Sequence, residues 1–292
     1  MPVLTDETVA KLKKLQLRAQ QVVEGFLIGL HQSPYHGFSV EFSDHRQYNP
    51  GEALRDIDWK IVAKTERYYV KRYEEETNLR TYILLDHSAS MFYKSADISK
   101  IDYAIQLAGA LSWLMMSQKD AVGLVTFNDK ITNLLPPKAY RSYLAQIFSI
   151  LTTLEPKAQT DLASNLGKVA ESIRKRSLII LISDLIDDPD RIISALKQYR
   201  YRNHELLVFH IQDFQEERFE FKKEALFIDV ETNEKVLVNP WQIKKEYLES
   251  YQTQVQTLKT ACHENRIEYN PISTSTNFND LLIKYLIKRR KG

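Results

Sequence analysis

The chain has 292 residues, of which 43% are hydrophobic and 27% are charged. This globular composition excludes a disordered chain, a collagen and a coiled-coil rod. The 40 Lys and Arg residues nearly balance the 38 Asp and Glu residues, for a net charge of +2, so a dedicated nucleic-acid binder is not expected. The single cysteine, Cys262, excludes an internal disulfide and a cysteine-based metal site, and it fits a reducing compartment.

Sequence signals of several other protein classes are missing. No run of about 18 uncharged apolar residues predicts a transmembrane segment, and the N-terminal residues lack the apolar core of a secretion signal. We therefore expect a cytoplasmic protein, with a peripheral position on a membrane complex as the alternative. The glycine patterns of dinucleotide-binding folds and P-loop NTPases are absent, as are GxSxG and HExxH motifs.

The N-terminal part is expected to form a helix followed by an ordered segment. Apolar residues from Leu12 to Leu30 recur at steps of three and four, which predicts a helix over residues 5–30. We expect this helix to dock on its own domain, and a membrane-surface or partner helix is the alternative. Residues 31–60 predict an ordered loop, and residues 66–79, where aromatic and charged residues alternate, predict a strand or an extended arm.

From residue 81 onwards, short apolar segments alternate with helical ones. Strands that are apolar on both faces and alternate with helices are typical of a parallel sheet that is covered on both sides. The predicted fold class is therefore α/β, a doubly wound, Rossmann-like sheet. The predicted strands lie at residues 81–91, 122–127, 131–138, 177–185 and 205–211, and the predicted helices at residues 101–118, 141–154, 160–175 and 189–200.

The C-terminal part interrupts this alternation before it returns to it. The segments ALFIDV and KVLVN flank ETNE, which predicts a β-hairpin inserted after the fourth buried strand. A helix over about 241–264, a strand over 266–272 and a closing helix over 277–290 follow. We divide the chain into an N-terminal segment, a core, an insertion and a return to the core, with bounds 1–80, 81–212, 213–264 and 265–292.

Polar side chains follow the predicted strands at the edge of the sheet where ligands bind in this fold class. Asp86, Ser88 and Ser90 end the first strand, Asp184 ends the strand over 177–185, and Thr160 precedes a helix. Each of these alone is an ordinary cap or turn residue. Together they offer carboxylate and hydroxyl oxygens, which suit Mg²⁺, with Mn²⁺ or Ca²⁺ as substitutes. We expect Asp184 to act through a water molecule.

The string Asp86-His87-Ser88-Ala89-Ser90, with Thr160 and Asp184, resembles the metal-ion-dependent adhesion site of von Willebrand factor A domains. The resemblance covers residues 81–212 and the last strand and helix. It implies a von Willebrand factor A-like core whose metal leaves one coordination position open, which a Glu or Asp of a protein partner fills. It also implies an interaction module and not a catalyst.

The string RQYNPGEALRDIDW at residues 46–59 resembles the signature of the domain of unknown function 58 family, which precedes a von Willebrand factor A-like core. Members are often associated with MoxR-type AAA+ ATPases, which implies an adaptor in a chaperone-like assembly. From the residues alone, the mixed charges predict an ion-pair latch, with a docking surface as the alternative. The matching positions are Gly29, His31, Ser33, Gly37, Glu41, Phe42, Arg46, Tyr48, Gly51, Arg55, Asp58 and Trp59.

Enzymatic alternatives find little support in the sequence. A haloacid-dehalogenase-type phosphatase needs a second Asp where Ser88 stands. His87 follows Asp86 directly and is expected to point away from Ser88, and His210 lies within a buried strand and is expected to be a core residue. We predict a non-enzymatic, metal-dependent interaction module, and the alternative is a metal-dependent phosphoryl or ester hydrolase.

Overall fold

The computed structural model of the protein describes residues 10, 12–20, 23, 46–47, 62–63, 68–70, 80–156, 161–221, 225–228 and 235–276. The chain divides into two compact units, Met1–Ile28 with Leu79–Gly292, and Gly29–Asn78. In the second unit, β1 (Arg46–Gln47) pairs antiparallel with β2 (Tyr69–Val70). β1 falls within the predicted loop and β2 within the predicted strand or arm. The side chains of the predicted latch at residues 46–59 lie outside the described residues.

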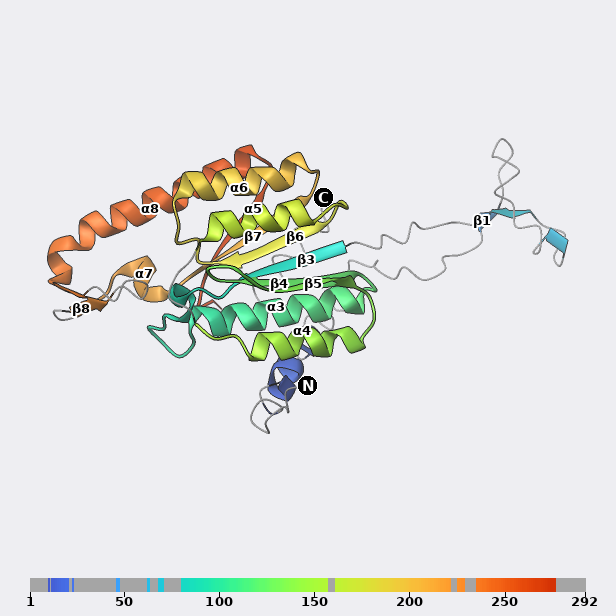
Figure 1. Ribbon diagram of the computed structural model, residues 1–292, viewed down its shortest axis with the longest axis horizontal. Coiled ribbons are helices and arrows are strands. Elements are labelled where there is room, and N and C mark those ends of the chain that lie inside the picture. The colour runs from blue at the N-terminus through green and yellow to red at the C-terminus, as the bar shows by residue number, and fades with distance from the viewer. Residues whose placement is uncertain are drawn as a thin grey trace. The chain divides into compact units, whose positions relative to one another are not determined.

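A six-stranded sheet forms the centre of the first unit (Figure 1). Its strand order is β10-β7-β6-β3-β4-β5, and all neighbouring strands are parallel except β4 and β5. The predicted α/β class and the predicted buried strands are confirmed. The strands are β3 (Arg80–Asp86), β4 (Ala121–Phe127), β5 (Ile131–Lys138), β6 (Leu178–Ser183), β7 (Glu205–Gln212) and β10 (Glu268–Ser273).

The edge strand β5 is the exception in this mostly parallel sheet, because it runs antiparallel to β4. Only residues 128–130 separate the two strands, whereas a parallel pair needs a crossover of about a dozen residues or more. The register shifts between Val122 and Leu124. A Cβ atom on the intervening Gly123 would lie 2.5 Å from the carbonyl oxygen of Leu135. Glycine therefore permits the close approach of the two backbones at this irregularity.

Helices cover both faces of the sheet (Figure 1). α3 (Lys100–Ser117) and α4 (Ser142–Thr152) lie on one face, and α5 (Leu162–Ser172) and α6 (Pro189–Tyr201) lie on the other. Residues 12–20 are helical and bury Leu15 and Ala19 in the hydrophobic cluster of α3 and α4. This part of the predicted N-terminal helix therefore docks on its own domain, as expected from the sequence.

The structure contains the hairpin and the long helix that the sequence predicts after the fourth buried strand. β8 (Ala225–Ile228) and β9 (Lys235–Val238) pair as an antiparallel hairpin, and α8 (Pro240–Glu264) follows. Cys262 of α8 is buried in the cluster that α5 and α6 form with the sheet. The predicted closing helix over residues 277–290 lies outside the described residues. No helix in the described ranges combines the length and the hydrophobicity that spanning a bilayer requires.

One short helix in the insertion, α7 (Phe214–Arg218), was not predicted from the sequence. It begins with a capping box, in which the Asp213 side chain accepts from the backbone N–H of Gln215 and the Glu216 side chain accepts from the backbone N–H of Asp213. Five residues are too few for a visible hydrophobic period, so this helix depends on its cap and its contacts.

Candidate functional site

The site predicted from the sequence lies at the point where the strand order reverses. Numbered along the chain, the six strands of the sheet have the order 6-5-4-1-2-3, so the first strand, β3, is the neighbour of both the second and the fourth. Doubly wound sheets bind ligands outside the carboxyl ends of the strands at such a switch point. β3 ends at Asp86 and β6 ends at Ser183, so both strand ends contribute residues there.

The carboxylate of Asp86 joins these two strand ends. Its side chain is buried, with 1% of the residue exposed. The backbone N–H of Ser88 donates to Oδ1 over 2.9 Å, and the hydroxyl of Ser183 donates to Oδ2 over 2.7 Å. The Ser183 hydroxyl also accepts from the backbone N–H of Leu185 over 2.9 Å. Asp86 is thus held in its orientation by the end of β6 and by the loop that follows β3.

The two predicted hydroxyl ligands lie side by side after this carboxylate. Ser88 precedes η2 (Ala89–Phe92), a single turn of 3₁₀-helix that contains Ser90. The Oγ atoms of Ser88 and Ser90 are 3.0 Å apart, and both residues are buried. The turn therefore places the hydroxyl of Ser90 beside that of Ser88, and the structure brings Asp86, Ser88 and Ser90 together.

The position of Thr160 lies outside the described residues, so its role stays a prediction. The next residue, Asp161, caps α5, because its carboxylate accepts from the backbone N–H of Ser164 over 3.4 Å. Asp161 also pairs with Arg191, whose Nη2 lies 2.7 Å away. The helix that Thr160 was expected to introduce is thus present, with Asp161 as its N-cap.

Asp184 has a partner that the sequence analysis did not foresee. The Nζ atom of Lys100 lies 2.8 Å from Oδ2 of Asp184 and 2.6 Å from Oε1 of Glu216, and the Lys100 side chain is completely buried. Burial lowers the pKa of Lys100, but the charges of Asp184 and Glu216 outweigh this effect, and its pKa lies above the ordinary value. The ammonium group therefore stays charged and compensates Asp184.

Two sequence signals mark residues of this network, although they do not predict that these residues meet. Lys100 is the first residue of α3, where a positive charge meets the positive end of the helix dipole and is unfavourable without acidic partners. Asp213 and Glu216 have the spacing of a capping box, which marks a helix start close to the end of β7. The three-dimensional meeting of Lys100 with Asp184 and Glu216 could not be read from these signals alone.

The electrostatic environment of Asp86 differs from that of Asp184. Burial, and secondly the charge of Asp184, raise the pKa of Asp86 to about 7, against the opposing effect of the hydrogen bonds from Ser183 and Ser88. Ser88 and Ser183 donate hydrogen bonds to Asp86 through neutral groups, a backbone N–H and a hydroxyl. A cation beside Asp86 would relieve the repulsion between the two carboxylates and return the pKa of Asp86 towards its usual range.

The donor set indicates which kind of ion fits this position. Asp86, Ser88 and Ser90 present carboxylate and hydroxyl oxygens, which suit a small, hard divalent cation such as Mg²⁺. Within the described ranges, no group of three or more His, Cys, Asp or Glu side chains could hold a metal ion. A nitrogen- or sulfur-ligated zinc or iron centre therefore has no candidate in that part of the chain.

The histidines near the strand ends have structural partners. For His87, Nδ1 lies 3.1 Å from the carbonyl oxygen of Glu155 and Nε2 lies 2.9 Å from the hydroxyl oxygen of Thr132. His210 is buried, and its Nδ1 lies 2.5 Å from the hydroxyl oxygen of Tyr269. Burial is the main reason that the pKa of His210 falls to about 4. His210 is a core residue, as expected from the sequence.

The switch-point loop and the strand order define an α/β protein with a doubly wound, Rossmann-like sheet. The chain belongs to the family described as "Protein of unknown function DUF58", whose model matches residues 44–258. The family resemblance stated from the sequence is thereby confirmed.

The curated relatives that resemble the chain include proteins of two mycobacteria. The "Uncharacterized protein Rv1480" of Mycobacterium tuberculosis and the "Uncharacterized protein Mb1516" of Mycobacterium bovis are each 26% identical over 208 residues. The matched segment covers 70% of this chain and 65% of each relative, so the chain spans less than two thirds of their length.

Similar solved structures include the conserved hypothetical protein BatB from Bacteroides thetaiotaomicron, which is 16% identical with a TM-score of 0.49. That comparison covers 73% of this chain and 100% of the BatB chain. The VWA domain of SpRpn10 is 14% identical with a TM-score of 0.41, and the comparison covers 70% of this chain and 93% of that domain.

Proposed function

We propose that the protein is a non-enzymatic interaction module that binds a divalent cation at Asp86, Ser88 and Ser90 and holds an acidic side chain of a protein partner there. The observation that carries this proposal is the buried carboxylate of Asp86, which has neutral hydrogen-bond donors and two adjacent serine hydroxyls beside it. Mg²⁺ suits this set best, with Mn²⁺ or Ca²⁺ as substitutes. Thr160 and Asp184 complete the proposed set, Asp184 through a water molecule.

The partner's chemistry follows from the charges around the site. Lys100 compensates Asp184, so Asp86 is the carboxylate that would neutralise one of the two charges of the cation. A bound cation would retain positive charge and an open coordination position, which favour a Glu or Asp side chain. Ser183 and the backbone of Ser88 would keep Asp86 oriented during this exchange of ligands.

We further propose that the partner belongs to the MoxR-type AAA+ ATPases and that the protein acts as an adaptor in a chaperone-like assembly. Membership of the family supports this proposal, because the sequence resemblance implies such an association. The proposed acidic contact gives the adaptor a chemically defined way to hold an ATPase subunit.

Titration calorimetry with Mn²⁺ and Mg²⁺ tests the metal site directly. We expect Asp86→Ala and Ser90→Ala to abolish measurable binding while circular dichroism shows an intact fold. Asp97→Ala is the matched control, because Asp97 is an exposed aspartate in the same loop region. Equal affinity of the wild type and Asp86→Ala would contradict the proposal.

A pull-down with a purified MoxR-type ATPase, with Mg²⁺ or with EDTA, tests the partner. We expect capture in Mg²⁺ that EDTA and Asp86→Ala both remove. Capture that is insensitive to EDTA would contradict a metal-mediated contact. An assay with p-nitrophenyl phosphate and p-nitrophenyl acetate tests the hydrolase alternative, and Mg²⁺-dependent turnover that Asp86→Ala abolishes would contradict the non-enzymatic assignment.

A further inference from the structure

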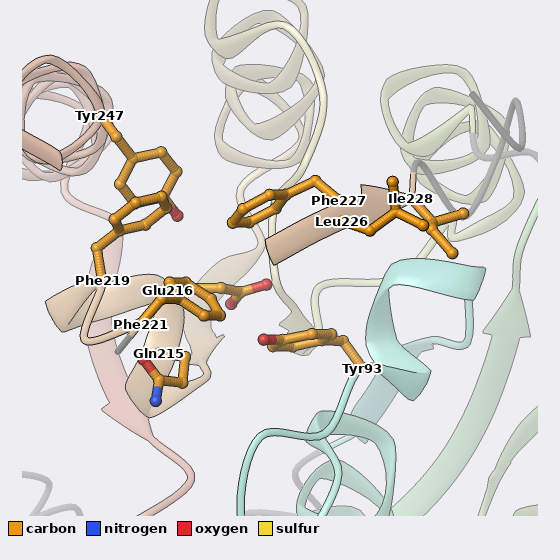
Figure 2. Close-up of a pocket in the computed structure, with 9 residues that line it drawn as sticks. All are labelled: Tyr93, Gln215, Glu216, Phe219, Phe221, Leu226, Phe227, Ile228 and Tyr247. Atoms are coloured by element: carbon orange, nitrogen blue, oxygen red, sulfur yellow. The ribbon is translucent and has the colours of Figure 1, made fainter. Parts of the chain in front are cut away.

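A pocket of about 480 Å³ lies beside the switch-point loop, between the end of η2 and the insertion (Figure 2). Its walls carry five aromatic rings, with aliphatic side chains of β8 at one side and the carboxylate of Glu216 among them. The rings belong to Tyr93, Phe219, Phe221, Phe227 and Tyr247. Neither the fold nor the proposed metal site accounts for this combination.

Four of the five rings form one connected wall, and the ring of Tyr93 lies across from it. Phe219 has ring-centroid distances of 4.4 Å to Tyr247 and 5.8 Å to Phe227, and Phe221 lies 5.2 Å from Phe227. Figure 2 shows the ring of Tyr93 on the other side of the space that Phe227 borders. Aromatic faces carry negative charge density, so a space between such rings favours a cation.

The charges around the pocket favour a cation as well. Burial is the main cause of the raised pKa of Tyr93. The charges of Asp213 and Glu216 raise this pKa further, and each of the two effects is larger than the opposing effect of Lys100. Burial raises the pKa of Tyr247 to about 12, and the charge of Glu216 again adds more than Lys100 removes. At both tyrosines, therefore, the nearby carboxylates have a larger effect than the buried ammonium of Lys100.

We propose that this pocket binds an arginine side chain of a protein partner. A guanidinium group is planar, stacks on aromatic faces and keeps its charge, so it suits rings and a carboxylate together. The Tyr93 ring already attracts one cation, because Nζ of Lys100 lies 5.9 Å from its centroid. Arginine enters from the open side of the pocket and stacks between Tyr93 and Phe227.

The pocket and the proposed metal site are neighbours through two short connections. The backbone N–H of Tyr93 donates to the carbonyl oxygen of Ser90 over 3.1 Å, and Lys100 joins Glu216 to Asp184. A partner segment with an acidic residue close to an arginine would therefore engage both positions. This placement within the partner rests on the proposed function, whereas the binding of arginine in the pocket does not.

An NMR titration of the protein, labelled with ¹³C in its Phe and Tyr rings and kept in EDTA, tests the pocket. The probes are N-acetyl-arginine methylamide and the citrulline analogue, which keeps the shape of arginine but is neutral. We expect saturable shifts of the pocket rings with the arginine probe and at least about fivefold weaker binding of the citrulline probe. Equal binding of the two probes, or no saturable shift, would overturn the proposal.

Variants locate the binding and separate it from the metal site. We expect Tyr93→Leu and Phe227→Leu each to weaken the arginine probe about five- to tenfold; they lie on different elements, so either variant that keeps its fold decides the outcome. Tyr201→Leu is the matched control, because its ring is 83% exposed on α6. Asp86→Ala should leave arginine binding unchanged, so a failure of the metal proposal can be distinguished from a failure of the pocket proposal. Unchanged binding in the pocket variants would overturn the proposal.

Discussion

Two buried carboxylates at adjacent strand ends are stabilised in opposite ways. Asp86 is 1% exposed and Asp184 is 5% exposed, so water screens neither charge. Asp184 has an internal cation, Lys100, at 2.8 Å, whereas the described partners of Asp86 are neutral donors. The fold thus supplies a counter-charge to one carboxylate and leaves the other dependent on a proton or on an external cation.

The difference also gives Asp184 a structural role beside its proposed water-mediated contact with the cation. Through Lys100, Asp184 is tied to Glu216 at the start of the insertion, so this carboxylate helps to hold the insertion against the sheet edge. The contacts of Asp86 stay within the strand ends and the loop that follows β3. A carboxylate with only local contacts, such as Asp86, can accept and release a ligand without disturbing the insertion, whereas Asp184 cannot.

The largest expected effect comes from removing the internal cation. Lys100→Met keeps the apolar stem but leaves Asp184 and Glu216 without their ammonium partner, so the free energy of unfolding should fall by about 3–5 kcal/mol. Urea unfolding followed by circular dichroism measures this. Adding Asp184→Asn to the variant should restore part of the loss, and an unchanged urea midpoint in Lys100→Met would contradict the assigned compensation.

The second prediction concerns the uncompensated carboxylate. Asp86→Asn in EDTA at pH 8 should raise the free energy of unfolding by on the order of 2 kcal/mol, because no buried charge has to be accommodated. Urea midpoints of the wild type and the variant at pH 8 measure the gain. A variant that is less stable than the wild type at pH 8 would contradict the predicted charge penalty.

The same pair of proteins gives a pH dependence with a defined sign. The pKa of Asp86 is about 7 in the folded state and 3.8 as its ordinary value, so the folded wild type binds more protons between these values. The stability of the wild type relative to Asp86→Asn should fall as pH rises from 4 to 7, and the advantage of Asp86→Asn should vanish at pH 4. His210, with a lowered pKa, destabilises both proteins equally below its ordinary value of 6.5, so its effect cancels in the difference.

A smaller effect is expected at the neutral donor. Ser183→Ala removes the hydroxyl that donates to Asp86 and accepts from Leu185, and should reduce the free energy of unfolding at pH 8 by about 1–2 kcal/mol. The reduction should shrink at pH 4, where Asp86 is protonated. Ser112→Ala is the matched control, since this buried serine donates to the backbone carbonyl of Ala108 and not to a carboxylate, and its effect should not depend on pH.

The smallest predicted effect, that of an exposed ion pair, is the reference for the large effect of Lys100→Met. Lys245→Met removes an ion pair with Glu249 on α8, in which Nζ and Oε1 are 3.9 Å apart and the side chains are 86% and 66% exposed. Water screens such a pair, so the free energy of unfolding should change by less than about 0.5 kcal/mol. A loss as large as that of Lys100→Met would show that burial does not set the size of these effects.

Those parts of the architecture that follow from local apolar patterns were predictable. The runs that form β3 and β6 end in Asp86 and in Ser183 and Asp184, and parallel strands bring their carboxyl ends to one edge, so the site could be placed before the fold was known. The direction of β5 was missed, because its short connection to β4 was not weighed against the length of a parallel crossover.

The part of the site that was missed depends on contacts between distant segments. Lys100 and Glu216 are 116 residues apart, and each looks in the sequence like an ordinary charged residue at the surface of a helix. Their pairing depends on how α7 packs at the end of β7, and the spacing of apolar residues in the sequence does not predict this packing. Thr160 remains a prediction from the sequence.

The buried thiol of Cys262 can report the detachment of α8 from the sheet without any added label. Burial raises the pKa of this group to about 12, so the reactive thiolate is scarce at neutral pH and the sulfur is shielded by its neighbours. Alkylating reagents should therefore modify it only when α8 detaches from the sheet. Because no other cysteine occurs in the chain, the alkylation rate of the unaltered protein would measure that opening, and how a metal ion or a partner changes it.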